Sequence, residues 1–186
     1  MEELRRCTRW IKNDKLRAWT EECLQKAPDY FWKVPASSTG KYHPEFAQGE
    51  GGLVRHTRVA VYIALQLFDL ERFTPLEEDI AISALILHDT CKHGLEGADH
   101  TVSGHGRIAQ ELYCSDAPEG SIRWKVGRCI ASHMGNWDTP RPSDELEWFV
   151  THVVTPEWHF QHDAGRPLAE MVPERIAQFP EHAALI

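Results

Sequence analysis

Histidine is the residue type with the clearest chemical potential in this chain, which has eleven histidines among 186 residues. Four of them coincide with the apolar stripe of a predicted helix, because aliphatic residues recur on the same face one or two turns away. These four are His56, His88, His105 and His133. Any one of them alone would be explained as a core histidine paired with a backbone carbonyl. Four such positions on four helices instead predict a shared buried cluster.

An aspartate directly follows one of these histidines, so the His88-Asp89 pair adds a carboxylate to the cluster. Buried imidazoles need a partner for their nitrogen lone pairs, and a metal ion is such a partner. Imidazole together with carboxylate favours one or two divalent transition metals (Mn, Fe, Co, Ni or Zn) over Mg or Ca. Neighbouring helix residues point about 100° apart, so both members of the pair can reach one ion only at a helix end. The segment 90–94, which ends in glycine, matches such an end.

The elements that must position this cluster are helices. Periodic apolar residues predict an all-α chain, a bundle of five to seven helices without a convincing strand pattern. Thr74 followed by Pro75 predicts an N-cap with proline in the first turn, and Ser103 is a candidate cap of the next helix. The expected helices cover residues 2–26, 53–67, 75–88, 104–112, 121–133 and 143–154.

Three segments are expected along the chain. Residues 1–50 combine the first helix with a long Gly/Pro/Ser loop, residues 51–156 form the metal-binding helical core, and residues 157–186 form an irregular tail with one short helix near 173–179. The loop at 34–52 is longer than most connections, and such loops are usually functional or disordered. The histidines predicted to lie in loops are expected to be exposed; they are His43, His93 and His100.

Composition narrows the classes of partner. The net charge of −8 disfavours binding to duplex nucleic acid, which basic surfaces track. Five widely spaced cysteines without a CxxC motif predict neither a disulfide framework nor a cysteine zinc site. The N-terminus lacks the apolar region of a signal peptide, and no apolar run has the length of a membrane span. We therefore expect a cytoplasmic protein that does not associate with membranes, and oligomerisation stays open.

The order of these residues resembles the HD superfamily of metal-dependent phosphohydrolases. The residues that carry the resemblance are His56, then His88, Asp89 and Lys92 in an H-D-x-x-K arrangement, then His105 and His133. The stretch 51–57, Gly-Gly-Leu-Val-Arg-His-Thr, is similar to the G-G-L-x-x-H-T opening of many such domains. The loop with Ser-Ser-Thr-Gly-Lys also looks like that of small HD proteins from bacteria and their phages. The resemblance covers roughly residues 50–155 and implies an HD-type helical bundle.

The resemblance implies that a metal-activated water hydrolyses a phosphate ester of a nucleotide or another small phosphorylated substrate. Asp89 would bridge two ions or orient the water, and Lys92 would offset negative charge on the substrate. A solvated lysine at a helix C-terminus is the ordinary alternative for Lys92. A plain surface loop or surface salt bridges are the alternatives for two of the substrate-binding candidates, Lys41 and Arg55. The metal ligands would be His56, His88, Asp89, His105 and His133, and the last two histidines could contact the phosphate instead.

The chain departs from the family pattern at its last metal ligand. The family ends with an aspartate on a late helix, and the corresponding segment here, 147–155, contains none. His152 lies in this segment and is a candidate replacement ligand; other candidates are Asp138, Asp144 and Asp163. Two alternatives to a hydrolase therefore stay open. One is a non-catalytic binding or regulatory protein with a degenerate site, and the other is an HD-type di-iron oxygenase, which would need a full set of six ligands.

Overall fold

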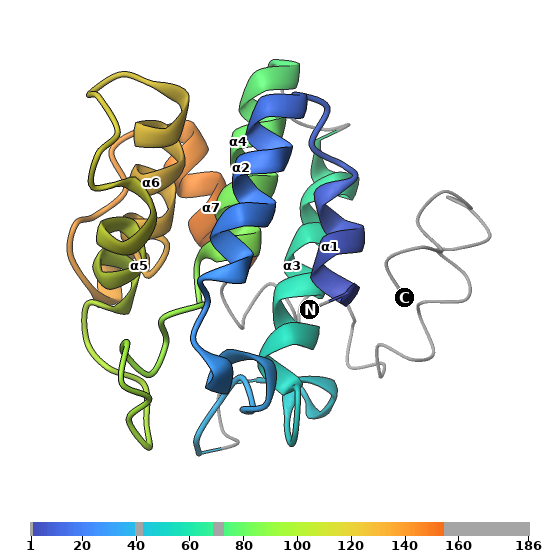
Figure 1. Cartoon of the computed structure of the whole chain (residues 1–186), viewed down its shortest axis with the longest axis vertical. Helices are drawn as coiled ribbons and strands as arrows, with labels where there is room; N and C mark the ends of the chain where they lie inside the picture. Colours follow the sequence, from blue (N-terminus) through green and yellow to red (C-terminus); the bar gives the residue numbers. More distant parts are fainter. Residues whose placement is uncertain (1, 40–42, 69–72, 155–186) are drawn as a thin grey trace.

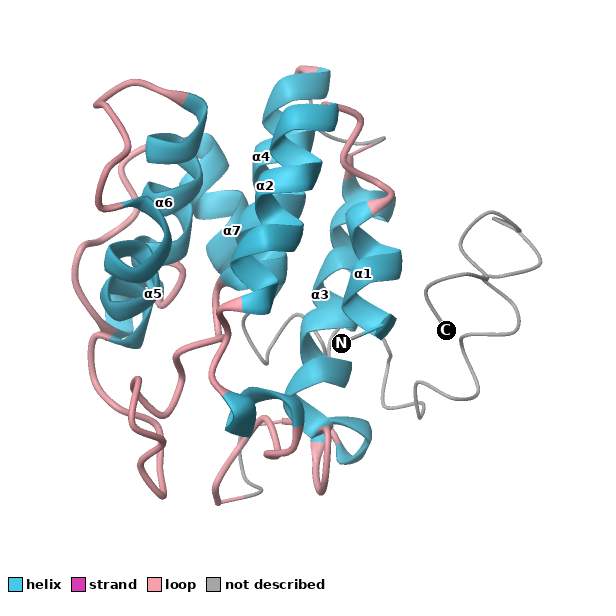
Figure 2. Ribbon diagram, in the orientation of Figure 1, coloured by secondary structure: helices cyan, strands magenta, loops and turns pink. Residues whose placement is uncertain are grey.

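The computed structural model describes residues 2–39, 43–68 and 73–154 (Figure 1). These residues form helices and no strand, which confirms the predicted all-α class (Figure 2). None of the helices described is long and apolar enough to cross a membrane. Some sequence predictions concern residues outside the described ranges. They are the predictions for Lys41, for Asp163 and for the tail 157–186 with a short helix near 173–179.

The described residues contain seven α-helices and three short 3₁₀ helices. The α-helices are α1 (Glu2–Thr8), α2 (Asp14–Gln25), α3 (Gly52–Leu67), α4 (Pro75–Leu87), α5 (His105–Cys114), α6 (Ile122–Ser132) and α7 (Glu145–Val154). The 3₁₀ helices are η1 (Asp29–Trp32), η2 (Glu45–Ala47) and η3 (Gly135–Trp137).

Helix α4 occupies the centre of the bundle and packs against α1, α2, α3, α6 and α7. Figure 1 shows α1 and α3 on one side of it and α5, α6 and α7 on the other. Every residue from Asp79 to Leu87 is buried, as expected for a helix that other helices enclose on all sides. Residues of α1 and α2, such as Leu4 and Leu24, belong to the same apolar core as α3 and α4.

The single helix predicted over residues 2–26 is wrong, because the chain breaks between Thr8 and Asp14 into α1 and α2. Two interactions stabilise this break. The side chain of Asn13 caps α2 by accepting from the backbone N–H groups of its first turn. The buried carboxylate of Asp79, from α4, accepts from the backbone N–H groups of Lys12 and Asn13, both at 2.8 Å. The second interaction comes from a distant part of the chain, so local periodicity could not reveal it.

The predicted helix starts are confirmed at α4 and α6. Thr74 and Glu77 form a capping box around Pro75, and Ser121 accepts from the backbone N–H of Trp124. The predicted cap Ser103 is wrong, because the N-cap of α5 is Gly104, with φ of 73°. The carboxylate of Asp138 accepts from the N–H of Gly104 and so holds the start of α5 against the segment that follows η3.

Candidate metal centre

The predicted histidines lie at neighbouring helix ends. His105 is the first residue of α5 and His56 lies in the second turn of α3, while His88 and His133 follow the last residues of α4 and α6. Asp89 follows His88 directly in the turn after α4. Two helix starts and two helix ends therefore meet at one place, where all five side chains are buried, with at most 3% of each exposed to solvent.

Backbone carbonyls set the tautomer of three of these imidazoles. Nδ1 of His88 lies 2.7 Å from the carbonyl oxygen of Leu85, and Nδ1 of His133 lies 2.7 Å from that of Ile130. His105 makes the same contact with Val102 at 3.0 Å. Because a carbonyl oxygen only accepts, each Nδ1 donates its proton there, and in the neutral ring Nε2 then carries the lone pair. Histidines that bind metals are commonly oriented in this way.

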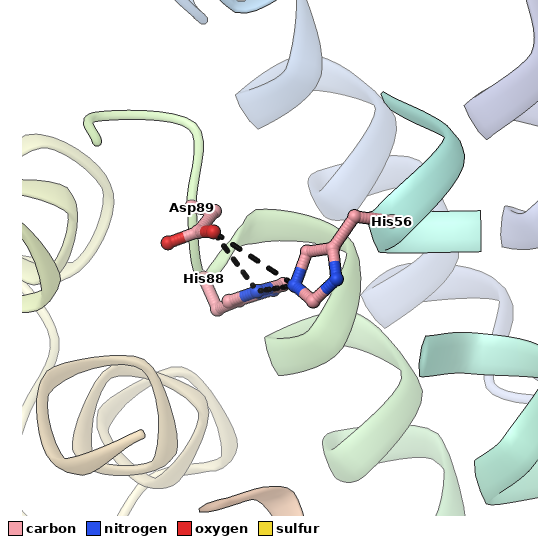
Figure 3. Close-up of side chains that lie close together, drawn as sticks. All are labelled: His56, His88 and Asp89. Carbon is pink, nitrogen blue, oxygen red and sulfur yellow. Dashed lines mark hydrogen bonds and ion pairs between the residues drawn. The ribbon is translucent and has the colours of Figure 1, made fainter. Parts of the chain in front are cut away.

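The Nε2 atoms and the Asp89 carboxylate form two groups of potential ligands. We call the first group, His56, His88 and Asp89, half-site A (Figure 3). The second group, Asp89, His105 and His133, is half-site B. Asp89 belongs to both groups, with Oδ2 directed toward half-site A and Oδ1 toward half-site B.

The nitrogen separations suit ligands that share one ion. Nε2 of His56 and Nε2 of His88 are 3.4 Å apart, and the same atoms of His105 and His133 are 3.1 Å apart. Two nitrogens that are each about 2.0–2.1 Å from one ion, at octahedral or tetrahedral angles, would lie roughly 2.9–3.4 Å from one another. Without a cation or a proton between them, the two lone pairs repel. The residues present therefore fit a metal ion in each half-site.

Burial keeps at least two of the imidazoles neutral. It lowers the pKa of His88 to about 3 and also lowers the pKa of His133. Both rings are therefore uncharged at neutral pH and keep the lone pair on Nε2 that a metal would bind. A metal ligand must be deprotonated, so these two histidines are prepared for binding without a further loss of protons.

Asp89 carries the negative charge of the centre. Burial raises the pKa of Asp89, but the Lys92 ammonium and the surrounding imidazoles outweigh this effect and hold the pKa well below its usual range. Nζ of Lys92 lies 2.7 Å from Oδ2 of Asp89. Oδ1 lies 3.0 Å from Nε2 of His105, but it is buried and accepts no hydrogen bond. A buried carboxylate oxygen without a donor is the type of group that a metal ion would satisfy.

The turn after α4, which carries Asp89 and Lys92, is fixed by two tyrosines. Tyr113 donates to the hydroxyl of Thr90, which itself donates to the carbonyl oxygen of Leu87. The hydroxyl of Tyr30 donates to the carbonyl oxygen of Gly94 at 2.7 Å and accepts from the backbone N–H of His93 at 3.0 Å. Sequence reasoning had no signal for these contacts, because η1 and α5 meet the turn only in the folded chain.

Two of the three loop histidines are not exposed as predicted. His93 is buried and its ring stacks on Tyr30, with ring centroids 5.2 Å apart. His43 is half-buried and packs its ring edge-to-face against His56, with centroids 4.7 Å apart. His100 is exposed, as predicted. The loop that precedes α3 thus reaches the metal centre through His43, a contact that no pattern in the sequence indicated.

Two other predicted site residues have different roles in the structure. Arg55 donates from Nε and both terminal nitrogens to the carbonyl oxygens of Phe46, Gln48 and Glu50, so its guanidinium holds the loop before α3. His152 is exposed and its ring stacks on Trp148, apart from the buried ligands. His152 belongs to neither half-site.

The remaining carboxylate candidates within the described residues also lie outside both half-sites. Asp138 accepts from the backbone N–H groups of Gly104 and Thr139. Asp144 forms an ion pair with Lys125. The buried carboxylate of α7 is Glu147, which pairs with Lys125 and with Arg128 on α6. No described carboxylate of α7 therefore takes the place of the family's last aspartate.

Comparisons with known proteins return no relative for this chain: no family model, no curated protein and no solved structure matches it. What can be said of its function therefore depends on the geometry of its own residues.

Proposed function

We propose that this protein is a metal-dependent phosphohydrolase of the HD type. The observation that supports this proposal best is the pair of buried half-sites that share Asp89, each with two imidazole nitrogens and one carboxylate oxygen. Three protein ligands for each ion leave coordination positions open for water and substrate, as in catalytic metal sites. A structural site would instead be closed by four protein ligands.

The ions would be held by residues already oriented for them. His56, His88 and Oδ2 of Asp89 would hold one ion, and Oδ1 of Asp89 with His105 and His133 would hold the other. When bound, two such ions lower the pKa of a coordinated water toward ~7 and withdraw charge from phosphoryl oxygens. Asp89 would keep the two ions together, and the carbonyls of Leu85, Val102 and Ile130 would keep three of the imidazoles aligned.

Among the described residues, Lys92 would be the one to meet the substrate beside the ions. Its side chain is 10% exposed, whereas the ligand side chains are 1–3% exposed, so it is less enclosed than the ligands that it adjoins. A phosphate ester that approached from this side would meet a positive charge before it met the ions. The ammonium would then stabilise the negative charge that develops on the phosphoryl group. We propose a nucleotide or another small phosphate ester as the substrate.

Metal content and turnover test this proposal together. We expect untagged protein to contain near-stoichiometric transition metal by inductively coupled plasma mass spectrometry. It should hydrolyse bis-p-nitrophenyl phosphate, or a member of a nucleotide panel, when Mn²⁺, Co²⁺ or Ni²⁺ is added. A double variant, His88→Ala with Asp89→Ala, should lose both properties, whereas His152→Ala should keep them.

A non-catalytic binding or regulatory role is the second candidate, because no described residue of α7 supplies the carboxylate that completes the family pattern. The same experiment separates the two roles. Tight metal binding without hydrolysis of any phosphate ester would favour the binding role. Absence of bound metal even after incubation with each candidate ion would contradict the enzyme proposal, because the proposed reaction needs a metal-activated water.

A further inference from the structure

The two half-sites have the same ligand chemistry. Each offers two Nε2 atoms and one oxygen of Asp89, and the ligands of both are buried. The type and number of protein ligands therefore give neither half-site an advantage for the first ion. Any difference in affinity must come from the groups that surround these ligands.

Lys92 is the charged group that distinguishes the half-sites. Its Nζ lies 2.7 Å from Oδ2, the oxygen directed toward half-site A. Its backbone is held on both sides, because its N–H donates to the carbonyl of Asp89 and its carbonyl accepts from Val102. The ammonium is therefore positioned where a cation at half-site A would take its carboxylate ligand. Oδ1 on the side of half-site B accepts no hydrogen bond.

Because Lys92 pairs with only one oxygen of Asp89, the two half-sites should bind their ions in a fixed order. An ion that enters half-site B meets a carboxylate oxygen that faces imidazole nitrogens, at 3.0 Å for His105 and 3.5 Å for His133, and that pairs with no ammonium of the described residues. An ion that enters half-site A must break the ion pair between Lys92 and Asp89 and overcome repulsion by a buried ammonium. An ammonium and a metal cation beside the same carboxylate oxygen repel strongly, because the two positive charges lie within a few ångströms of one another. This effect is far larger than any difference expected between two sets of identical ligands.

We propose that Lys92 makes the centre load in sequence, with the first ion in half-site B and the second in half-site A. This inference rests on the metal binding of the proposed function and adds the order and the residue that controls it. The second ion displaces the ammonium from Oδ2, and the displaced ammonium stays beside the completed centre. When only half-site B is occupied, the Lys92 ammonium repels cations from half-site A, so cations that bind weakly do not occupy it.

The order of loading can be observed in the wild-type chain. We would titrate metal-free protein with Zn²⁺ and follow the imidazole nitrogens of ¹⁵N-histidine-labelled protein by NMR, with signals assigned through His56→Gln and His105→Gln variants. The first equivalent should shift Nε2 of His105 and His133, and the second should shift Nε2 of His56 and His88. Equal shifts of both pairs, or earlier shifts at His56 and His88, would overturn the proposal and leave the phosphohydrolase assignment standing.

The role of Lys92 is tested by isothermal titration calorimetry with Zn²⁺. Lys92→Met removes the charge and keeps an unbranched side chain, and we expect the ratio between the second and first dissociation constants to fall by roughly tenfold or more. Lys92→Arg keeps the charge and should preserve most of that ratio. An unchanged ratio in Lys92→Met would overturn the role of Lys92. Ordered binding of two ions without phosphatase activity would refute the enzyme proposal alone, and absence of binding would refute both.

Discussion

Asp89 is the residue on which both half-sites depend. Its two oxygens are directed toward two different pairs of imidazoles, and its charge is the only negative charge within the cluster of described ligands. The Lys92 ammonium already balances that charge in the metal-free state. Removal of the carboxylate would therefore leave a buried ammonium without its counter-charge, and this positive charge would oppose the binding of any cation nearby.

We expect Asp89→Asn to weaken binding at both half-sites by more than about 100-fold, since even the loss of a group behind a ligand costs 10–100-fold. Isothermal titration calorimetry with Zn²⁺ measures this effect. His152→Ala serves as the matched control and should bind as tightly as the wild type, because that ring is exposed and stacks on Trp148. Two tight sites in Asp89→Asn would contradict the bridging role of Asp89.

At the scale of elements, half-site B depends on how closely α5 and α6 pack. Gly106 lies next to His105, and a Cβ atom at this position would lie 2.6 Å from the carbonyl oxygen of Ile130 and 3.0 Å from Nδ1 of His133. The same carbonyl accepts from Nδ1 of His133. The absence of a side chain at Gly106 thus allows α5 to approach the end of α6 and brings the two histidines together.

Gly106→Ala should push α5 away from α6 and destabilise the fold by about 1–3 kcal/mol, the usual cost of overpacking. It should also lower the metal affinity of half-site B more than that of half-site A. Urea unfolding followed by circular dichroism, together with the NMR titration of labelled histidines, measures both effects. Glu111→Ala changes an exposed residue on the same helix and should leave both properties unchanged. Equal stability of Gly106→Ala and the wild type would show that the close approach is not required.

At the scale of the whole molecule, α7 packs against α4 and α6, and an ion-pair network joins it to α6. The buried Glu147 accepts from Lys125 at 2.9 Å, from Arg128 at 3.0 Å and from the backbone N–H of Ser143 at 3.0 Å. Burial raises the pKa of Glu147, but these hydrogen bonds outweigh it and lower the pKa below its ordinary value of 4.5. The network contributes stability only while Glu147 is ionised.

The pH dependence follows from the direction of this shift. A carboxyl group whose pKa is lower in the folded state stabilises the fold at pH values above its unfolded pKa, and this contribution is lost as the pH falls through the folded value. We expect Glu147→Gln to cost about 2 kcal/mol at neutral pH, the scale of a hydrogen bond to a charged group. The difference between wild type and variant should shrink below about pH 4.5. Urea unfolding of both proteins across pH 3–7 measures it, and a constant difference would contradict the assignment.

Much of the local structure could be predicted because it depends on nearby residues. Helical periodicity placed α3, α4, α6 and α7, and the side chains of Thr74 and Ser121 cap the helices that they precede. The predicted helix boundaries were wrong where a residue distant in the sequence determines where a helix begins or ends. The break before Asn13 needs Asp79 of α4, and the start of α5 needs Asp138. Backbone N–H groups satisfied by a remote carboxylate leave no local pattern.

The sequence by itself determined which residue types could form a metal centre, because inward-facing histidines on four helices and one His-Asp pair can be identified from spacing alone. Only the tertiary structure decided that Asp89 joins both half-sites, that Lys92 pairs with one of its oxygens, and that His152 faces solvent. Periodicity fixes the direction of a side chain relative to its own helix, but not the distance to a group on another helix. That distance depends on packing, such as the close contact of α5 with α6 at Gly106.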